Sequence, residues 1–163
     1  MTQQERVVKW DRMRYTKDKT AANLVLVAIV LDALYFVSIY KTDVGNYYYN
    51  WIIGASVVYN LLFMLSAFLA SEGVKSRKTG YTPLLIVIGL LQFVRIFYLP
   101  QQAKDATVTI QEVVYDVMGQ GQYLFVIGCL AVSGVCCVAA AVISSLHNRT
   151  LNRYLHSLEL QNQ

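Results

Sequence analysis

Four long apolar runs constrain the fold of this chain more than any other feature of its sequence. They cover residues 21–40, 51–70, 81–98 and 123–146, about half of the 163 residues. Each run matches the roughly 17 to 25 residues that a helix needs to cross the hydrocarbon core of a bilayer. The sequence therefore predicts one all-α integral membrane domain over residues 1–163, a polytopic protein whose four transmembrane helices form an up-down bundle.

The basic residues in the connecting segments predict the orientation of these helices. Six Lys and Arg residues precede the first run, three lie between the second and third runs, and two follow the fourth. Only Lys41 and Lys104 lie in the other two connections. Because cytoplasmic connections carry an excess of Lys and Arg, both termini are expected on the cytoplasmic side of the membrane.

Polar side chains inside the apolar runs form the candidate functional site. Asp32 lies near the middle of the first run, where a carboxylate costs about 2.5 to 3.5 kcal/mol on insertion scales and needs a partner or a task. A rise of about 1.5 Å per residue places Asn60 of the second run at a similar depth. Gln92 and Arg95 are three residues apart on one face of the third run. The predicted members of this intramembrane cluster are Asp32, Arg95, Asn60, Gln92, Tyr35 and Tyr59.

Two interpretations of this cluster stay open. In the structural interpretation Asp32 pairs with Arg95 and Asn60 bridges to Gln92, so that the cluster fixes which helices are neighbours. In the functional interpretation the same groups line a cavity that binds a cation, a proton or a small polar solute. The structural interpretation is favoured, because these residues can satisfy one another.

The fourth run has a face of small residues. Small side chains let two helix backbones approach closely in lipid, so this run is predicted to be the packing centre of the bundle or the face of an oligomer. Val138 is expected to point outward from it. The predicted helix-packing face consists of Gly128, Ser133, Cys137, Ala141 and Ser145.

Two shorter segments carry amphipathic patterns. Thr2 and Glu5 have the spacing of a capping box, which predicts a short amino-terminal helix lying at the inner membrane surface. In the third, outer connection, residues 101–122, apolar residues from Ile110 to Val117 recur at helical spacing, which predicts a second short amphipathic helix. The alternation in ATVTI also permits a strand, and the helix is favoured.

Signatures of catalysis and of metal or nucleic-acid binding are missing from the sequence. It contains no HExxH, GxSxG or glycine-rich phosphate-binding motif, and Asp32 is the one carboxylate in the apolar runs. His147 and His156 lie outside the fourth run, which holds all three cysteines, so neither a metal nor another cofactor is expected. Asp11 and Asp18 interrupt the basic amino terminus, which argues against a nucleic-acid partner.

These patterns together predict a non-catalytic membrane protein. Its expected partners are the lipid bilayer and either further copies of itself or the other subunits of a membrane assembly, in which it acts as a homo-oligomer or an accessory subunit. The alternative function is that of a small transporter or channel for a cation, a proton or a small polar solute, with its site around Asp32.

Overall fold

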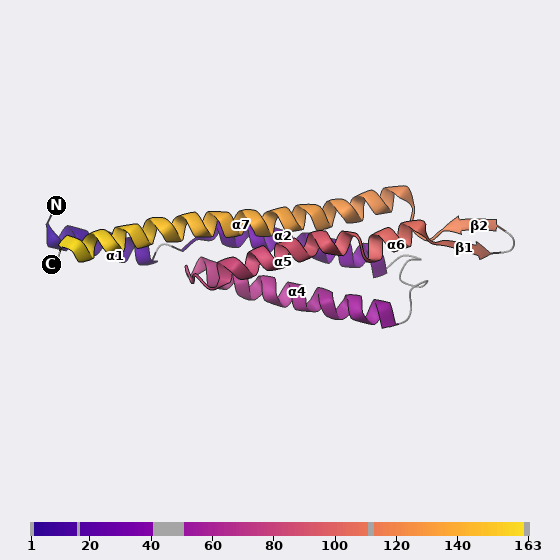
Figure 1. Cartoon of the computed structure of the whole chain (residues 1–163), viewed down its shortest axis with the longest axis horizontal. Helices are drawn as coiled ribbons and strands as arrows, with labels where there is room; N and C mark the ends of the chain where they lie inside the picture. Colours follow the sequence, from indigo (N-terminus) through magenta and orange to yellow (C-terminus); the bar gives the residue numbers. More distant parts are fainter. Residues whose placement is uncertain (1, 16, 41–50, 111–112, 162–163) are drawn as a thin grey trace.

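The computed structural model describes residues 2–15, 17–40, 51–110 and 113–161, which form helices and one short hairpin (Figure 1). The elements in chain order are α1 (Gln3–Tyr15), α2 (Lys19–Tyr40), α4 (Trp51–Lys75), α5 (Tyr81–Ile96), α6 (Leu99–Asp105), β1 (Thr107–Ile110), β2 (Val113–Asp116) and α7 (Gln120–Gln161).

Four helical segments are long and apolar enough to cross a membrane. They are Lys19–Tyr40, Ile53–Lys75, Tyr81–Asp105 and Gln120–Arg153, and each contains one of the apolar runs of the sequence. The third segment includes both α5 and the short helix α6. The chain therefore has the composition of a multi-pass integral membrane protein.

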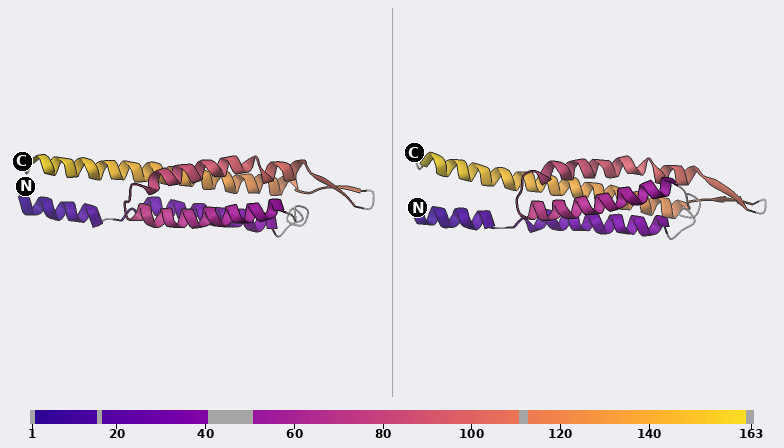
Figure 2. Two further views of the ribbon diagram at one scale, coloured as in Figure 1. Left: turned by 60° about the horizontal axis from the view of Figure 1, so that its bottom comes forward. Right: turned by 90° about the horizontal axis from the view of Figure 1, so that it is seen from below.

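Helix α7 is the centre of packing. It packs against both α2 and α5, whereas α4 packs mainly against α2 and makes fewer contacts with α5. Figure 2 shows this arrangement from two further sides. The apolar core consists of two separate clusters along the bundle axis. One cluster lies near the turn between α4 and α5, and the other lies toward the hairpin and includes none of the α4 side chains that the structure describes.

Helices α5 and α7 cross where two glycines meet. A Cβ atom on Gly134 would lie 2.9 Å from the Phe93 ring and 3.1 Å from the carbonyl oxygen of Gly89, so a side chain there would have to displace the ring. Gly89 is equally confined, because its Cβ would lie 3.1 Å from a methyl group of Val138. Val138 therefore lies against α5, and the prediction that it points outward is wrong.

The small residues of α7 are buried in steps of three and four residues. Ser133, Cys137 and Ala141 are buried as part of the predicted packing face. Ser145 is only half-buried, and Gly128 is exposed with no atom within 4 Å of a Cβ built on it. A strict four-residue repeat advances about 40° further than a full turn at each step, since a helix has about 3.6 residues per turn. The repeat therefore drifts away from α2 and α5 by Ser145, and Gly128, five residues before Ser133, points to another side of the helix.

The third connection contains a β-hairpin in place of the predicted amphipathic helix. Strands β1 and β2 pair antiparallel, with Thr107 opposite Asp116 and Ile110 opposite Val113. Six of the eight strand residues are Val, Ile or Thr, whose branched Cβ atoms favour an extended backbone. The prediction of a helix through Ile110 and Val117 is wrong for this reason, and the helix in this connection is α6, which precedes the hairpin.

The two ends of the chain project beyond the turn between α4 and α5, away from the hairpin (Figure 2). The amide of Thr2 donates to Glu5 at 2.9 Å and the amide of Glu5 donates to the Thr2 hydroxyl at 3.3 Å, which is the capping box that the sequence predicts. Helix α1 extends along the axis of the molecule and contacts α7. It does not lie across the end of the bundle, as a helix at the membrane surface would.

A buried polar layer as the candidate functional site

A buried ion pair joins α2 to α5 between the two apolar clusters. Nη1 of Arg95 lies 2.8 Å from Oδ1 of Asp32, and the exposed fractions of the two side chains are 6% and 0%. Asp32 follows Ala28 of one apolar cluster by one helical turn and precedes Tyr35 of the other. The pair therefore belongs to a polar layer that separates two apolar layers.

Gln92 extends the polar layer to α7. Its side-chain amide donates to Oδ1 of Asp32 at 3.0 Å and to the Ser133 hydroxyl at 3.4 Å. The Ser133 hydroxyl in turn donates to the backbone carbonyl of Ala28 at 3.1 Å. Sequence reasoning placed Ser133 on the packing face only. Its place in the polar layer depends on the rotation of α7, which the periodicity of small residues does not give.

Asn60 brings α4 into the layer, through a different contact from the predicted one. Its side-chain oxygen accepts a hydrogen bond of 2.6 Å from Nη2 of Arg95, and its amide donates to the sulfur of Met64 at 3.6 Å. The predicted bridge between Asn60 and Gln92 does not form. Arg95 is thus the residue that joins α2, α4 and α5, because its guanidinium group can donate several hydrogen bonds in different directions.

Two tyrosine rings contact the same guanidinium group. The Cζ atom of Arg95 lies 4.2 Å from the centre of the Tyr35 ring and 4.9 Å from the centre of the Tyr59 ring. A cation held this close to an aromatic face is stabilised by the electron density of the ring. The two tyrosines were predicted to supply hydroxyl groups to the site, whereas the contacts to Arg95 are made by their rings.

Three oxygen atoms of the polar layer are left without hydrogen bonds. Among the described residues, Oδ2 of Asp32, Oε1 of Gln92 and the Tyr35 hydroxyl are buried and have no hydrogen-bond partner. The carboxylate and amide oxygens are acceptors, and a buried acceptor without a partner costs free energy. The acidic side of the layer can therefore take up a proton or a small donor group, whereas the basic side is bonded to Asp32 and Asn60.

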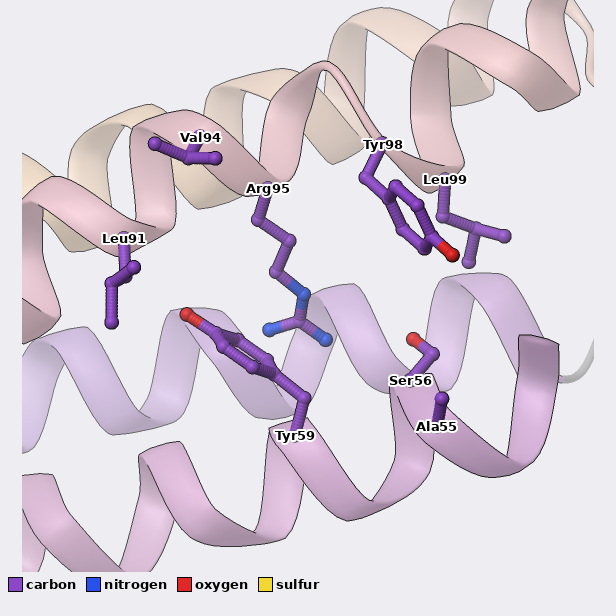
Figure 3. Close-up of a pocket in the computed structure, with 8 residues that line it drawn as sticks. All are labelled: Ala55, Ser56, Tyr59, Leu91, Val94, Arg95, Tyr98 and Leu99. Atoms are coloured by element: carbon purple, nitrogen blue, oxygen red, sulfur yellow. The ribbon is translucent and has the colours of Figure 1, made fainter. Parts of the chain in front are cut away.

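A groove opens beside the polar layer, between α4 and α5. It has a volume of about 310 Å³. Figure 3 shows Arg95 reaching from α5 into the space between the helices, with the Tyr59 ring next to its guanidinium group. The residues that line the groove are Ala55, Ser56, Tyr59, Leu91, Val94, Arg95, Tyr98 and Leu99. The sequence did not single out Ser56, because it is separated from the cluster by a full helical turn.

A second buried polar contact lies at the opposite end of the bundle. The Asp18 carboxylate caps α2 by accepting from the amide of Ala21 at 3.2 Å, and it also contacts Nδ1 of His147 on α7 at 2.8 Å. The backbone amide of Asp18 donates to the carbonyl of Lys75 at the end of α4. Sequence reasoning missed this junction. An Asp immediately before a helix is a familiar N-cap signal and could have identified its first half.

The chemistry that these sites can support is limited. Within the described ranges no three His, Cys, Asp or Glu residues come together as a metal site would require, and the three cysteines are free. The polar layer holds one carboxylate, one guanidinium group and neutral amides or hydroxyls. It can hold helices together or bind a small ligand.

The fold and the polar layer define a class of protein: a helical protein with four segments able to span a membrane and a buried charged layer between them. Comparison of the chain with protein-family models, with curated proteins and with solved structures gives no match. The function is therefore argued from the residues themselves.

Proposed function

We propose that this protein is a non-catalytic, four-span integral membrane protein that acts as a homo-oligomer or as an accessory subunit of a larger membrane assembly. The observation that carries the proposal is the mutual compensation of its buried charges: Asp32 and Arg95 pair, and Gln92 of α5 and Asn60 of α4 complete the pair. A layer of this kind fixes which helices are neighbours. In lipid, apolar contacts alone cannot do this, because lipid tails are as apolar as the side chains of the helices.

The distribution of charge supports an orientation with both termini in the cytoplasm. The amino-terminal helix, the turn after α4 and the carboxy-terminal end of α7 lie at one end of the molecule, and the hairpin lies at the other (Figure 1). The first end carries the many Lys and Arg residues of the connecting segments. Cytoplasmic segments are enriched in these residues, which supports an orientation with this end in the cytoplasm.

The projecting ends of the chain support a role in assembly. Val7 and Val8 of α1 are 56% and 66% exposed, and Leu160 near the end of α7 is 64% exposed. These residues lie beyond the four segments that can span the membrane, so lipid tails do not cover them in a perpendicular bundle. Apolar side chains grouped at one end of a protein are typical of contact with a second chain.

The experiment that tests this proposal is gentle detergent extraction from native membranes followed by measurement of particle mass. We expect a stoichiometric oligomer or complex. Val8→Glu should dissociate it, because a charge would enter the apolar contact, whereas Gln4→Glu adds the same charge at a polar position of α1 and should leave it intact. A monodisperse monomer in the wild-type extract would contradict the proposal.

A second candidate function is transport of a proton or a small cation through the polar layer. The observation that favours it is the pair of buried acceptors without hydrogen bonds, Oδ2 of Asp32 and Oε1 of Gln92. Structural polar networks leave few such atoms. Flux into sealed vesicles that contain the wild-type protein, compared with vesicles that contain Asp32→Asn, tests this function directly.

A further inference from the structure

The groove between α4 and α5 exists because the outer part of α4 is left out of the core. Phe63, Ala67, Ala70 and Val74 of α4 belong to one apolar cluster, and Asn60 belongs to the polar layer. Among the side chains of α4 that the structure describes, none belongs to the cluster nearer the hairpin. The contacts of α4 with α5 are correspondingly few. The space that remains faces sideways between two helices able to span a membrane, so its natural contents come from the lipid phase.

The polar layer presents its basic side to this groove. Arg95 is the only charged residue among those that line it, whereas Asp32 lies behind Arg95 on α2 and is fully buried. Two of the five N–H groups of Arg95 donate to Asp32 and Asn60, and its guanidinium group has further N–H groups to offer. Figure 3 shows the Ser56 hydroxyl and the Tyr98 ring on the same side of the groove as the end of Arg95. These groups are matched to an oxygen-bearing anion.

The rest of the groove is matched to a hydrocarbon chain. Leu91 and Val94 line it from α5 on the side of Arg95 that is away from Tyr98 (Figure 3). The volume of about 310 Å³ is at the lower end of the roughly 300 to 1,000 Å³ of small-molecule sites, which suits one chain better than the two chains of a phospholipid. Arg95 also lies ten residues before Asp105, the outer end of the third segment that can span a membrane, which is deeper than a phospholipid phosphate sits.

We propose that this groove binds a long-chain fatty acid from the bilayer, with its carboxylate on Arg95 and its chain along Leu91 and Val94. The carboxylate accepts from the guanidinium group and from the Ser56 and Tyr98 hydroxyls. Charge-assisted hydrogen bonds of this kind are the strong ones, and a site shielded from water strengthens them further. The binding site is independent of whether the protein forms an oligomer.

The experiment uses the full chain in phosphatidylcholine nanodiscs and a fatty acid with a diazirine group in its chain, at mildly alkaline pH. Irradiation should attach the label to the α4 and α5 segments that line the groove, as read by peptide mass spectrometry. Oleate should compete about tenfold better than oleyl alcohol, because the alcohol lacks the charge that pairs with Arg95.

Two matched variants of α4 locate the site. Ala55→Phe puts a ring into the groove while leaving every residue of the polar layer unchanged, and it should reduce specific labelling severalfold. Val58 is 57% exposed and does not line the groove. Val58→Phe therefore adds the same ring outside the site, and this variant should be labelled to the same extent as the wild type. Equal competition by oleate and oleyl alcohol would overturn the proposal. So would an Ala55→Phe variant that changes the particle mass and leaves labelling intact, because the groove would then hold a second chain.

Discussion

Nδ1 of His147 lies 2.8 Å from Oδ2 of Asp18, although the two residues are 129 positions apart in the sequence. Asp18 is almost fully buried, and its Oδ1 atom caps the first turn of α2. Among the described residues, His147 is the hydrogen-bond partner of Oδ2. The backbone amide of Asp18 contacts the end of α4. Asp18 therefore joins three helices at the end of the bundle opposite the hairpin, α2 and α7 through its side chain and α4 through its backbone.

Replacing His147 should destabilise the bundle at this junction. His147→Ala leaves a buried oxygen of Asp18 without a partner, which costs about 1 to 3 kcal/mol. Thermal unfolding in detergent measures the loss. His156→Ala, an exposed residue on the same helix, is the control and should unfold as the wild type does. Equal stability of both variants would show that the Asp18 contact contributes nothing.

The ion pair of the polar layer predicts a pattern across two substitutions. Asp32→Asn leaves the buried Arg95 charge uncompensated and should cost about 3 to 5 kcal/mol of unfolding free energy. Asp32→Asn combined with Arg95→Gln should recover part of that loss, because two neutral groups are easier to bury than one charge. Denaturant unfolding in detergent measures both variants. If Asp32→Asn alone leaves the protein fully stable but abolishes flux into vesicles, the transport function would be favoured.

The crossing of α5 and α7 predicts a sharp difference between two glycines of one helix. Gly134→Leu places atoms within 3 Å of the Phe93 ring and should destabilise the protein by about 1 to 3 kcal/mol through overpacking. Gly128→Leu is the same change at an open position and should have little effect, apart from a small gain in helix propensity. Thermal unfolding of the two variants is the measurement, and similar losses would place the packing seam elsewhere.

The orientation in the membrane predicts a labelling pattern for two introduced cysteines. In a background without Cys129, Cys136 and Cys137, Thr109→Cys in the hairpin should react with an impermeant thiol reagent added to intact cells. Ser76→Cys, in the turn after α4, should react only after the membrane is permeabilised. Both residues are exposed, so access to the reagent depends on the side of the membrane alone. The reverse pattern would invert the proposed orientation.

The sequence alone predicted the four apolar helices and the residues of the polar layer other than Ser133. Partition into lipid depends on the length and composition of each run, so a span can be identified without knowledge of its neighbours. The presence of Gln92 and Arg95 on one helix face could also be predicted from local sequence, because residues three apart on a helix share a face. The capping box at Thr2 and Glu5 is local in the same way.

The tertiary structure decided how these residues meet. Asp32 and Arg95 are 63 positions apart, and Arg95 reaches Asn60 while Gln92 reaches Ser133 because of the way the helices are rotated and crossed. The apolar pattern of a buried helix is too uniform to specify that rotation. The hairpin in the third connection likewise depended on pairing between two segments, which outweighed the helical spacing within them. Contacts between distant segments are a property of packing, and it was packing that placed Arg95 at the edge of a groove.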